Sequence, residues 1–314
     1  MRLISGRRTH ILLPSERSMR RLGFIGLGQM GSRMARRLLQ TERNLVVYNR
    51  SKGPLELLAK EGAIPATSAR EVGQKSDTVL LSLTDGNAVK QVIFGEEGLI
   101  SGMREGGIIV DTSTIGPMFA REIAELAGKE GVRVLDAPVS GGPEGAATGK
   151  LTFMIGGDLD AFNEIRNVFQ ILGDNLFYMG DSGSGQATKL VNQILVGIHI
   201  VATCEALLFG RSQGLDLQKT VDVITKSAGD SFVFRRDAPQ IISNLFSSGF
   251  QTYIIHKDLR LALDLVSQKP LLKLTDEARK LLEENLKLGN EKVDAVSVIK
   301  VLERLMGTSN SASN

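Results

Sequence analysis

A glycine-rich turn near the start of the chain constrains the fold most. The apolar run Leu22–Gly26 leads directly into Gly26-Leu-Gly-Gln-Met-Gly31, and a helical pattern over Ser32–Leu39 follows. In such a G-x-G-x-x-G motif the first glycine allows a tight turn, the second lets the backbone approach a pyrophosphate, and the third lets helix and strand pack closely. The helix N-terminus then offers free N–H groups to the phosphates. The flanking strand and helix favour a dinucleotide site over a plain glycine turn. The residues expected around the cofactor are Gly26, Leu27, Gly28, Gln29, Met30 and Gly31.

Short apolar strand signals alternate with helical patterns over the first part of the chain. The expected strands are Leu22–Gly26, Leu45–Tyr48, Thr78–Leu83, Ile108–Val110 and Val132–Leu135. Continuous apolar strands separated by amphipathic helices are typical of a parallel sheet that is covered on both faces. Two later runs, Leu151–Ile155 and Leu176–Tyr178, are expected to extend the same sheet. The pattern predicts an α/β Rossmann-type, doubly wound parallel sheet.

The pattern becomes almost wholly helical after Gly183. Gln186–Ser212 is predicted to be one long helix that ends at Gly214. Further helices are expected at Leu217–Lys226, Ala238–Leu245, Lys257–Val266 and Thr275–Leu288, with a last one from Asp294. A length of 314 residues suggests about two domains. We therefore place the cofactor-binding domain at residues 21–183 and an all-α C-terminal domain at residues 184–314.

The N-terminus forms a basic tail. Residues 1–21 carry six arginines against one acid, Glu16. We expect residues 1–20 to be a disordered tail, or Met19 to be the functional start, and we place the protein in the cytoplasm. An Arg-rich, acid-poor start is also typical of a transit peptide, which would place the protein in an organellar matrix.

Composition argues against several classes of function. A net charge of +3 is too small to indicate a nucleic-acid partner. The single cysteine, Cys204, excludes an intrachain disulfide framework. The three histidines have no metal-ligand spacing, so we expect no metal site. The most apolar stretch, Leu190–Cys204, carries polar side chains and is too short to span a bilayer, so we expect no membrane partner.

The end of the second strand bears on the choice of cofactor. An acidic residue there would bind the ribose 2′-hydroxyl of NAD, but this chain has Asn49-Arg50-Ser51-Lys52. An arginine can meet a 2′-phosphate with paired hydrogen bonds. We therefore predict that NADP(H) is preferred over NAD(H), with Asn49, Arg50 and Ser51 at the site. The alternative is that Arg50 is a solvated surface charge.

Five motifs, in order along the chain, resemble those of the β-hydroxyacid dehydrogenase family. The family includes 3-hydroxyisobutyrate dehydrogenase and tartronate semialdehyde reductase (2-hydroxy-3-oxopropionate reductase). The resemblance extends from Arg21 to about Met306. Its motifs are Gly23–Gly31, Asp111–Pro117, Asp136–Gly142, Gly183–Lys189 with Asn192, and His256–Leu259.

The resemblance assigns the catalytic proton donor to Lys189. Carbonyl reduction needs a proton donor beside the oxygen, and burial lowers the pKa of a lysine far enough for it to exchange a proton near neutral pH. A lysine that reaches solvent from the first turn of its helix is the alternative. Asn192 and Gln193 share the helix face of Lys189. We predict Asn192 as catalytic, with a polar helix–helix contact as the alternative, and Gln193 as substrate-binding. The Asn-Gln pair is more similar to tartronate semialdehyde reductases than to 3-hydroxyisobutyrate dehydrogenases.

A second loop is expected to bind the substrate. Ser140, Gly141 and Gly142 combine a hydroxyl with consecutive backbone N–H groups, which form an anion-binding concavity that suits a carboxylate. A plain turn would have a similar composition, but the resemblance favours the substrate loop. The resemblance further places Leu83, Thr84 and Thr114 beside the nicotinamide and brings Lys257 to the cofactor or substrate from the helical domain.

The sequence therefore predicts an NADP-preferring oxidoreductase acting on a small β-hydroxy acid or semialdehyde that carries a carboxylate. A glyoxylate or succinic semialdehyde reductase is the alternative within this class. The resemblance and the apolar helical half imply a homodimer or homotetramer. A non-catalytic dinucleotide-binding module is the rival of another class, and imine reductases share the fold. Relatives of both rivals differ from this chain at the position of Lys189.

Overall fold

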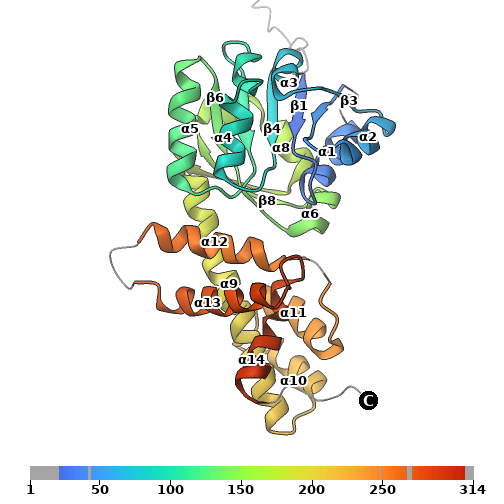
Figure 1. The fold of residues 1–314 in the computed structure, drawn as a ribbon, viewed down its shortest axis with the longest axis vertical. Helices are drawn as coiled ribbons and strands as arrows, with labels where there is room; N and C mark the ends of the chain where they lie inside the picture. Colours follow the sequence, from blue (N-terminus) through green and yellow to red (C-terminus); the bar gives the residue numbers. More distant parts are fainter. Residues whose placement is uncertain (1–20, 42–43, 248, 267–270, 308–314) are drawn as a thin grey trace, which may run out of the picture.

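The computed structural model of the chain describes residues 21–41, 44–247, 249–266 and 271–307. The tail predicted for residues 1–20 lies outside these ranges. An α/β domain is stacked along the long axis on a helical domain, and the helix α9 (Ser184–Ser212) runs between them (Figure 1). The predicted fold class, an α/β domain followed by an all-α domain, is confirmed.

One sheet forms the centre of the first domain. Its strands are β1 (Leu22–Ile25), β2 (Val46–Tyr48), β3 (Ile64–Pro65), β4 (Thr78–Leu81), β5 (Ile108–Asp111), β6 (Arg133–Asp136), β7 (Val139–Ser140), β8 (Thr152–Gly157) and β9 (Asn175–Gly180). Their order is β3-β2-β1-β4-β5-β6-β8-β7, with β9 also paired to β8. The strands from β3 to β6 are mutually parallel, whereas β8 runs antiparallel to β6 and β7 and parallel to β9. The sequence predicted β8 and β9 but not the two-residue strands β3 and β7. Apolar runs do not encode direction, so the antiparallel orientation of β8 was not predicted either.

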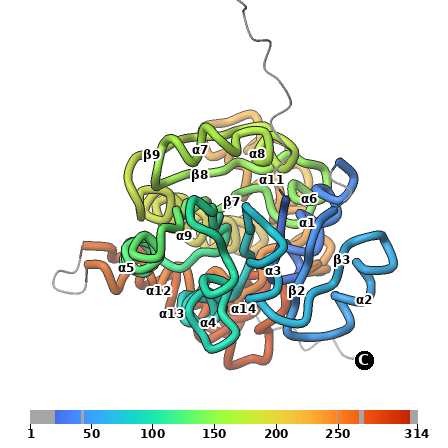
Figure 2. Tube along the Cα trace, turned by 90° about the horizontal axis from the view of Figure 1, so that it is seen from above, coloured from blue at the N-terminus to red at the C-terminus, as the bar shows by residue number. Residues whose placement is uncertain are grey.

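Helices cover both faces of the sheet (Figure 2). They are α1 (Gly31–Thr41), α2 (Lys52–Lys60), α3 (Ala69–Lys75), α4 (Gly86–Phe94), α5 (Pro117–Lys129), α6 (Gly142–Thr148), α7 (Leu159–Glu164) and α8 (Arg166–Leu172), with a 3-10 turn at Leu99–Ser101. In β1, Phe24 packs with α1 and α8 in one core, and its neighbour Ile25 packs with α3, α4 and α5 in the other. Alternate residues of a strand point to opposite faces, so a sheet covered on both sides needs strands that are apolar throughout.

The helical domain is built around α9. It also contains α10 (Leu217–Ile224), α11 (Phe232–Ser243), α12 (Thr252–Asp264), α13 (Lys273–Lys287), a 3-10 turn at Ala295–Val298, and α14 (Ile299–Leu305). The buried side chains Ile200, Cys204 and Leu207 of α9 lie in the core of this domain. The helices α11 and α12 begin five or six residues earlier than predicted. The Ser231 hydroxyl caps α11 at Phe234 N, before the predicted start at Ala238, and α12 begins five residues ahead of Lys257.

The length of α9 corrects one prediction. By length and composition alone, α9 could cross a membrane, and it is the one helix of the described residues that could. The expectation that no stretch of the chain is long and apolar enough to span a bilayer was therefore wrong. Half of its most apolar stretch is buried within the protein, and its apolar side chains form part of the core of the helical domain.

Candidate active site

The start of α9 is anchored at the carboxyl end of the sheet. Asp136, the last residue of β6, accepts hydrogen bonds from Gly183 N at 2.7 Å and from Gln186 N at 2.8 Å. This carboxylate satisfies N–H groups that a helix start leaves without partners. At Gly185, a Cβ atom would lie 2.2 Å from Met154 O, so only glycine allows this close approach. The motif glycines thus fix where the following turn of α9 lies.

Gln186 joins α9 to the loop after β5. Its Oε1 accepts hydrogen bonds from Ile115 N at 2.9 Å and Gly116 N at 3.0 Å, and its Nε2 donates to Ser113 O at 2.8 Å. The side chain is fully buried. It therefore holds the loop that contains Thr114 against the first turn of α9. In the sequence, the position of Gln186 directly before Ala-Thr-Lys189 in the motif was the signal that could have indicated this contact with the loop.

Lys189 lies buried on the next turn of α9, with 6% of its surface exposed. Burial lowers the pKa of its ammonium group from 10.5 to about 8, Asp258 opposes this by attraction, and Lys257 adds to it by repulsion. The alternative of a solvated lysine therefore does not fit this structure. A buried amine with a pKa near 8 can hold or release a proton close to physiological pH.

A polar cluster from α12 meets α9 beside Lys189. Lys257 Nζ donates to Thr114 O at 2.6 Å and lies 2.8 Å from Asp258 Oδ1. Asp258 Oδ2 accepts a hydrogen bond from Gln193 Nε2 at 2.7 Å, and Gln193 Oε1 accepts one from Asn192 Nδ2 at 3.0 Å. The structure thus brings Asn192, Gln193, Lys257 and Thr114 into one chain of contacts. Asp258 connects them, and the sequence analysis did not single it out.

The predicted substrate loop lies between β7 and α6. Ser140 ends β7, and Gly141 and Gly142 follow with φ values of +128° and +62°, in the region that favours glycine. Gly141 packs toward Leu151, whereas a Cβ on Gly142 would meet nothing within 4 Å. The loop has the open glycine turn that an anion site requires. Its role in substrate binding stays a prediction.

A second buried acid braces the loop after β4. Ser113 Oγ accepts a hydrogen bond from Leu83 N at 2.8 Å, and Ser113 N donates to Asp111 Oδ1 at 3.0 Å. Burial raises the pKa of Asp111 to about 7, while the hydrogen bonds from Ser113 oppose the rise. The Leu83-Thr84 loop is therefore held by the same post-β5 segment that Gln186 anchors.

A cleft of about 530 Å³ runs along the glycine-rich turn. It is lined by Gly26, Gly28, Gln29, Met30, Asn49, Arg50, Ser51, Leu83 and Thr84 among others. A Cβ on Gly26 would lie 2.2 Å from Ser82 O, and one on Gly31 would lie 1.9 Å from Gly26 O, so both glycines serve close packing. At Gly28 nothing lies within 4 Å of a Cβ, which leaves the backbone open to a pyrophosphate. These features fit a dinucleotide. Leu27 and Gly31 are buried and are not among the residues that line the cleft.

The end of β2 carries the residues predicted to choose the cofactor. Asn49 connects the glycine-rich turn to the end of β2. Its Oδ1 accepts a hydrogen bond from Leu27 N at 2.9 Å, and its Nδ2 donates one to Ser51 O at 2.9 Å. Arg50 is exposed at the cleft. Ser51 precedes α2, yet its side chain makes no capping hydrogen bond to that helix. The Ser51 hydroxyl and the start of α2 therefore remain available to an anion.

The helical domain supplies a wall that the sequence analysis missed. Gln251, Tyr253 and Ile254, at the start of α12, line the same cleft. Asp294 fixes the segment before them, since its Oδ2 accepts from Gly249 N at 2.9 Å and Phe250 N at 3.0 Å.

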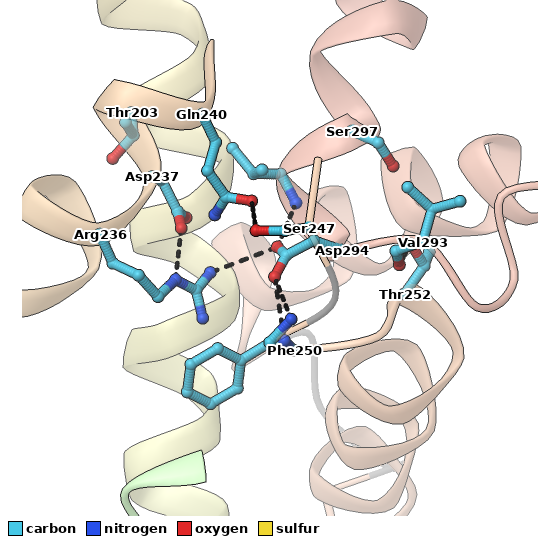
Figure 3. Close-up of polar contacts among 12 residues, drawn as sticks. Thr203, Arg236, Asp237, Gln240, Ser247, Phe250, Thr252, Val293, Asp294 and Ser297 are labelled. Carbon is cyan, nitrogen blue, oxygen red and sulfur yellow. Dashed lines mark hydrogen bonds and ion pairs between the residues drawn. The ribbon is translucent and has the colours of Figure 1, made fainter. Parts of the chain in front are cut away.

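A buried cluster in Figure 3 supports this segment. Arg236 stacks over the Phe250 ring with 4.0 Å to its centroid and pairs with Asp237 and Asp294. The start of α12 is thus held in place by α11 and by the residues around 294.

Comparisons with known proteins agree with this arrangement. Residues 21–180 match the model of the NAD binding domain of 6-phosphogluconate dehydrogenase, and residues 183–302 match that of NADP-dependent 3-hydroxyisobutyrate dehydrogenase. The chain is 34% identical over 291 residues to 2-(hydroxymethyl)glutarate dehydrogenase of Eubacterium barkeri, covering 92% of this chain and 97% of that protein. It is 35% identical over 288 residues to 2-hydroxy-3-oxopropionate reductase of Escherichia coli, covering 90% and 97%. The chain belongs to the β-hydroxyacid dehydrogenase family.

Solved structures support the same assignment. The crystal structure of 3-hydroxyisobutyrate dehydrogenase from Salmonella typhimurium has a TM-score of 0.80 and 31% identity, covering 89% of this chain and 99% of that one. A complex of Psf3 with NADP+ and 2-OPP has a TM-score of 0.84 and 29% identity, covering 90% and 99%. An imine reductase from Myxococcus stipitatus has a TM-score of 0.60 and 24% identity, which shows a shared fold alone. The protein is an NAD(P)-dependent dehydrogenase that acts on CH–OH groups.

Proposed function

We propose that the protein is an NADP-preferring reductase or dehydrogenase of the 2-hydroxy-3-oxopropionate reductase or 3-hydroxyisobutyrate dehydrogenase type. Its substrate is a small β-hydroxy acid or the corresponding semialdehyde. The observation that carries the proposal is Lys189, a buried lysine with a pKa of about 8 on a helix turn tied to the loops around the cofactor cleft. A binding module without catalysis would gain nothing from this costly burial.

Each predicted site residue has its own role in the proposed reaction. When bound, the nicotinamide supplies or accepts the hydride. Lys189 donates a proton to the substrate oxygen in reduction and accepts it in oxidation. Asn192 lies one turn further on the same helix face and holds the lysine or the substrate oxygen. Ser140, Gly141 and Gly142 bind the carboxylate through a hydroxyl and backbone N–H groups.

The preference for NADP(H) rests on the end of β2. Arg50 is exposed at the cleft, and the uncommitted Ser51 hydroxyl lies beside it at the start of α2. A 2′-phosphate would meet a guanidinium, a hydroxyl and the positive end of a helix dipole together. No acidic side chain stands at this strand end to favour a free 2′-hydroxyl.

Variants of Lys189 test the mechanism. A positioned proton donor contributes about a hundred- to ten-thousand-fold in rate, so Lys189→Ala should lose turnover by that factor. Lys189→Arg should fail as well, because a guanidinium keeps its proton. Binding of NADPH, followed by fluorescence titration, should change little in both variants. Near-normal single-turnover rates in Lys189→Ala with intact cofactor binding would refute this role and favour another proton donor.

The substrate is identified by a screen of NADPH oxidation. Tartronate, methylmalonate and succinic semialdehydes and glyoxylate differ by few contacts, and pockets discriminate weakly between such groups. We expect highest kcat/KM with tartronate semialdehyde, because the Asn192-Gln193 pair is similar to that of its reductases. Highest kcat/KM with glyoxylate or succinic semialdehyde would favour the alternative within the class, and no turnover of any of them would favour the binding module.

We also propose that the active form is a homodimer or homotetramer. Large apolar side chains are exposed on the helical domain, among them Val191, Leu195, Phe209, Leu215 and Phe232. Large apolar side chains that are exposed in this way are typical of an interface between subunits. Sedimentation velocity tests the proposal, and a monomer at micromolar concentration would contradict it.

A further inference from the structure

The side chain of Gln193 is directed to protein groups at both of its polar atoms. It is 2% exposed, its Nε2 donates to Asp258 Oδ2, and its Oε1 accepts from Asn192 Nδ2. A residue whose task is to read a substrate would be expected to keep its amide open to the substrate. These contacts give Gln193 a different place in the site, between Asn192 and Asp258.

Asp258 depends on Gln193 for its hydrogen bonding. The carboxylate is 1% exposed. Lys257 Nζ lies 2.8 Å from Oδ1, but the geometry is not that of a hydrogen bond, and Oδ1 accepts none from the described residues. Within the described part of the chain, the side-chain hydrogen bond to this carboxylate comes from Gln193. A buried carboxylate that loses such a bond is left without the directed contact that fixes its orientation.

The charge of Asp258 acts on Lys189. Its attraction raises the pKa of the lysine, while burial and Lys257 lower it. The other charged groups at this end of α9 have partners elsewhere. Asp136 caps α9, Asp111 binds Ser113, and Arg121 of α5 donates to Ser182 O. Asp258 is thus the acid whose orientation bears most directly on the lysine.

We propose that Gln193 is a positioning residue, which holds the Asp258 carboxylate in a fixed orientation against α9, one turn from Lys189, and thereby keeps its negative charge near that lysine. It is not a substrate ligand in this assignment. The inference rests on the proposed role of Lys189 as the proton donor. It identifies the residue that positions the negative charge favouring the protonated form of Lys189.

The variant Gln193→Leu, which keeps the size of the side chain but removes its amide, tests the proposal. Without the hydrogen bond, the carboxylate of Asp258 is free to turn from Gln193 toward Lys257, and its charge supports the protonated lysine less. In the direction of reduction, the pH at which kcat/KM begins to fall should therefore move lower by about half a unit to one unit. The shift should be the same for two substrates of different size. Thr203→Val, at another buried polar residue of α9, is the matched control and should leave the profile unchanged.

A double-variant cycle identifies the route of the effect. Asp258→Asn alone should move the profile in the same direction, and adding Gln193→Leu should then have little further effect. Additive shifts would overturn the proposal, and so would an unchanged profile with a KM change confined to one substrate. If Gln193→Leu does not fold, Gln193→Asn, whose amide is one methylene shorter, should give a smaller shift in the same direction.

A direct readout separates this proposal from the proposed function. Competitive labelling of Lys189 by acetic anhydride across pH, followed by peptide mass spectrometry, reports its ionisation without turnover. The reactivity profile should move lower in Gln193→Leu. If that profile stays in place while Lys189→Ala abolishes turnover, the role given to Gln193 fails alone. If Lys189→Ala keeps its turnover, the proposed mechanism fails, whatever the labelling shows.

Discussion

Replacement of Lys189 by methionine should stabilise the protein while it removes turnover. Burial lowers the pKa of this lysine from 10.5 to about 8, and each tenfold loss of proton affinity corresponds to about 1.4 kcal/mol. The protonated folded state therefore carries a penalty of about 3 kcal/mol. Methionine fills a similar volume without a charge. We expect a gain of about 2 kcal/mol at pH 7, less than the full penalty because methionine does not reproduce the packing of the lysine side chain in every detail.

The pH dependence of this gain follows from the direction of the pKa change. The folded-state pKa lies below that of the unfolded chain, so both states are protonated below about pH 8 and the penalty is complete there. Between about pH 8 and pH 10.5 the unfolded state binds more protons, and the stability of the unmodified protein rises with pH relative to the variant. The advantage of Lys189→Met should therefore shrink across that interval.

Urea unfolding of both proteins at pH 7 and pH 10 measures this difference. Lys129→Met is a matched control, because Lys129 is an exposed lysine of α5 that pairs with Glu125 four residues earlier. Its effect should stay within about 0.5 kcal/mol at either pH. The reasoning would be refuted by a Lys189→Met variant that is less stable than the unmodified protein at pH 7, or by a gain that does not shrink at pH 10.

Three further predictions address the cofactor turn, the substrate loop and the start of α9. Arg50→Asp should reverse the order of the Michaelis constants, from lower for NADPH to lower for NADH; equal use of both cofactors by the unmodified protein would contradict the role of Arg50. Propionaldehyde should be reduced far more slowly than succinic semialdehyde if Ser140–Gly142 binds a carboxylate, and comparable rates would exclude that role. Gly185→Ala should lower stability by about 3 kcal/mol or more in thermal unfolding, because its Cβ would lie 2.2 Å from Met154 O. Gly28→Ala meets open space, so it should keep the fold and weaken cofactor binding, and equal stability losses for the two alanines would contradict this distinction.

The parts of the fold that were predictable from sequence have local causes. Leu22–Ile25 is buried on both faces, so its residues are apolar throughout and the strand is visible in the sequence. The turn after it needs glycine at Gly26 and Gly31 because backbone atoms approach closely there. The short helices α3, α4 and α6 were missed, since seven to nine residues carry too little periodicity to be recognised.

The candidate site could be predicted only where a motif is contiguous. Gly183–Lys189 can be recognised as a unit, yet its members meet distant partners: Gln186 binds the loop at Ser113–Gly116, and Gly185 approaches Met154. The contact between Gln193 and Asp258 joins residues 65 positions apart. On sequence alone the spacing of Gln193 from Lys189 placed it on the catalytic face and so suggested a substrate ligand. The spacing of residues along the sequence does not show that α12 packs on α9. This packing puts the buried carboxylate of Asp258 beside Gln193, and the amide of Gln193 binds that carboxylate. A helix face that is shared with a catalytic lysine therefore does not by itself distinguish a residue that touches substrate from one that holds the lysine's counterion.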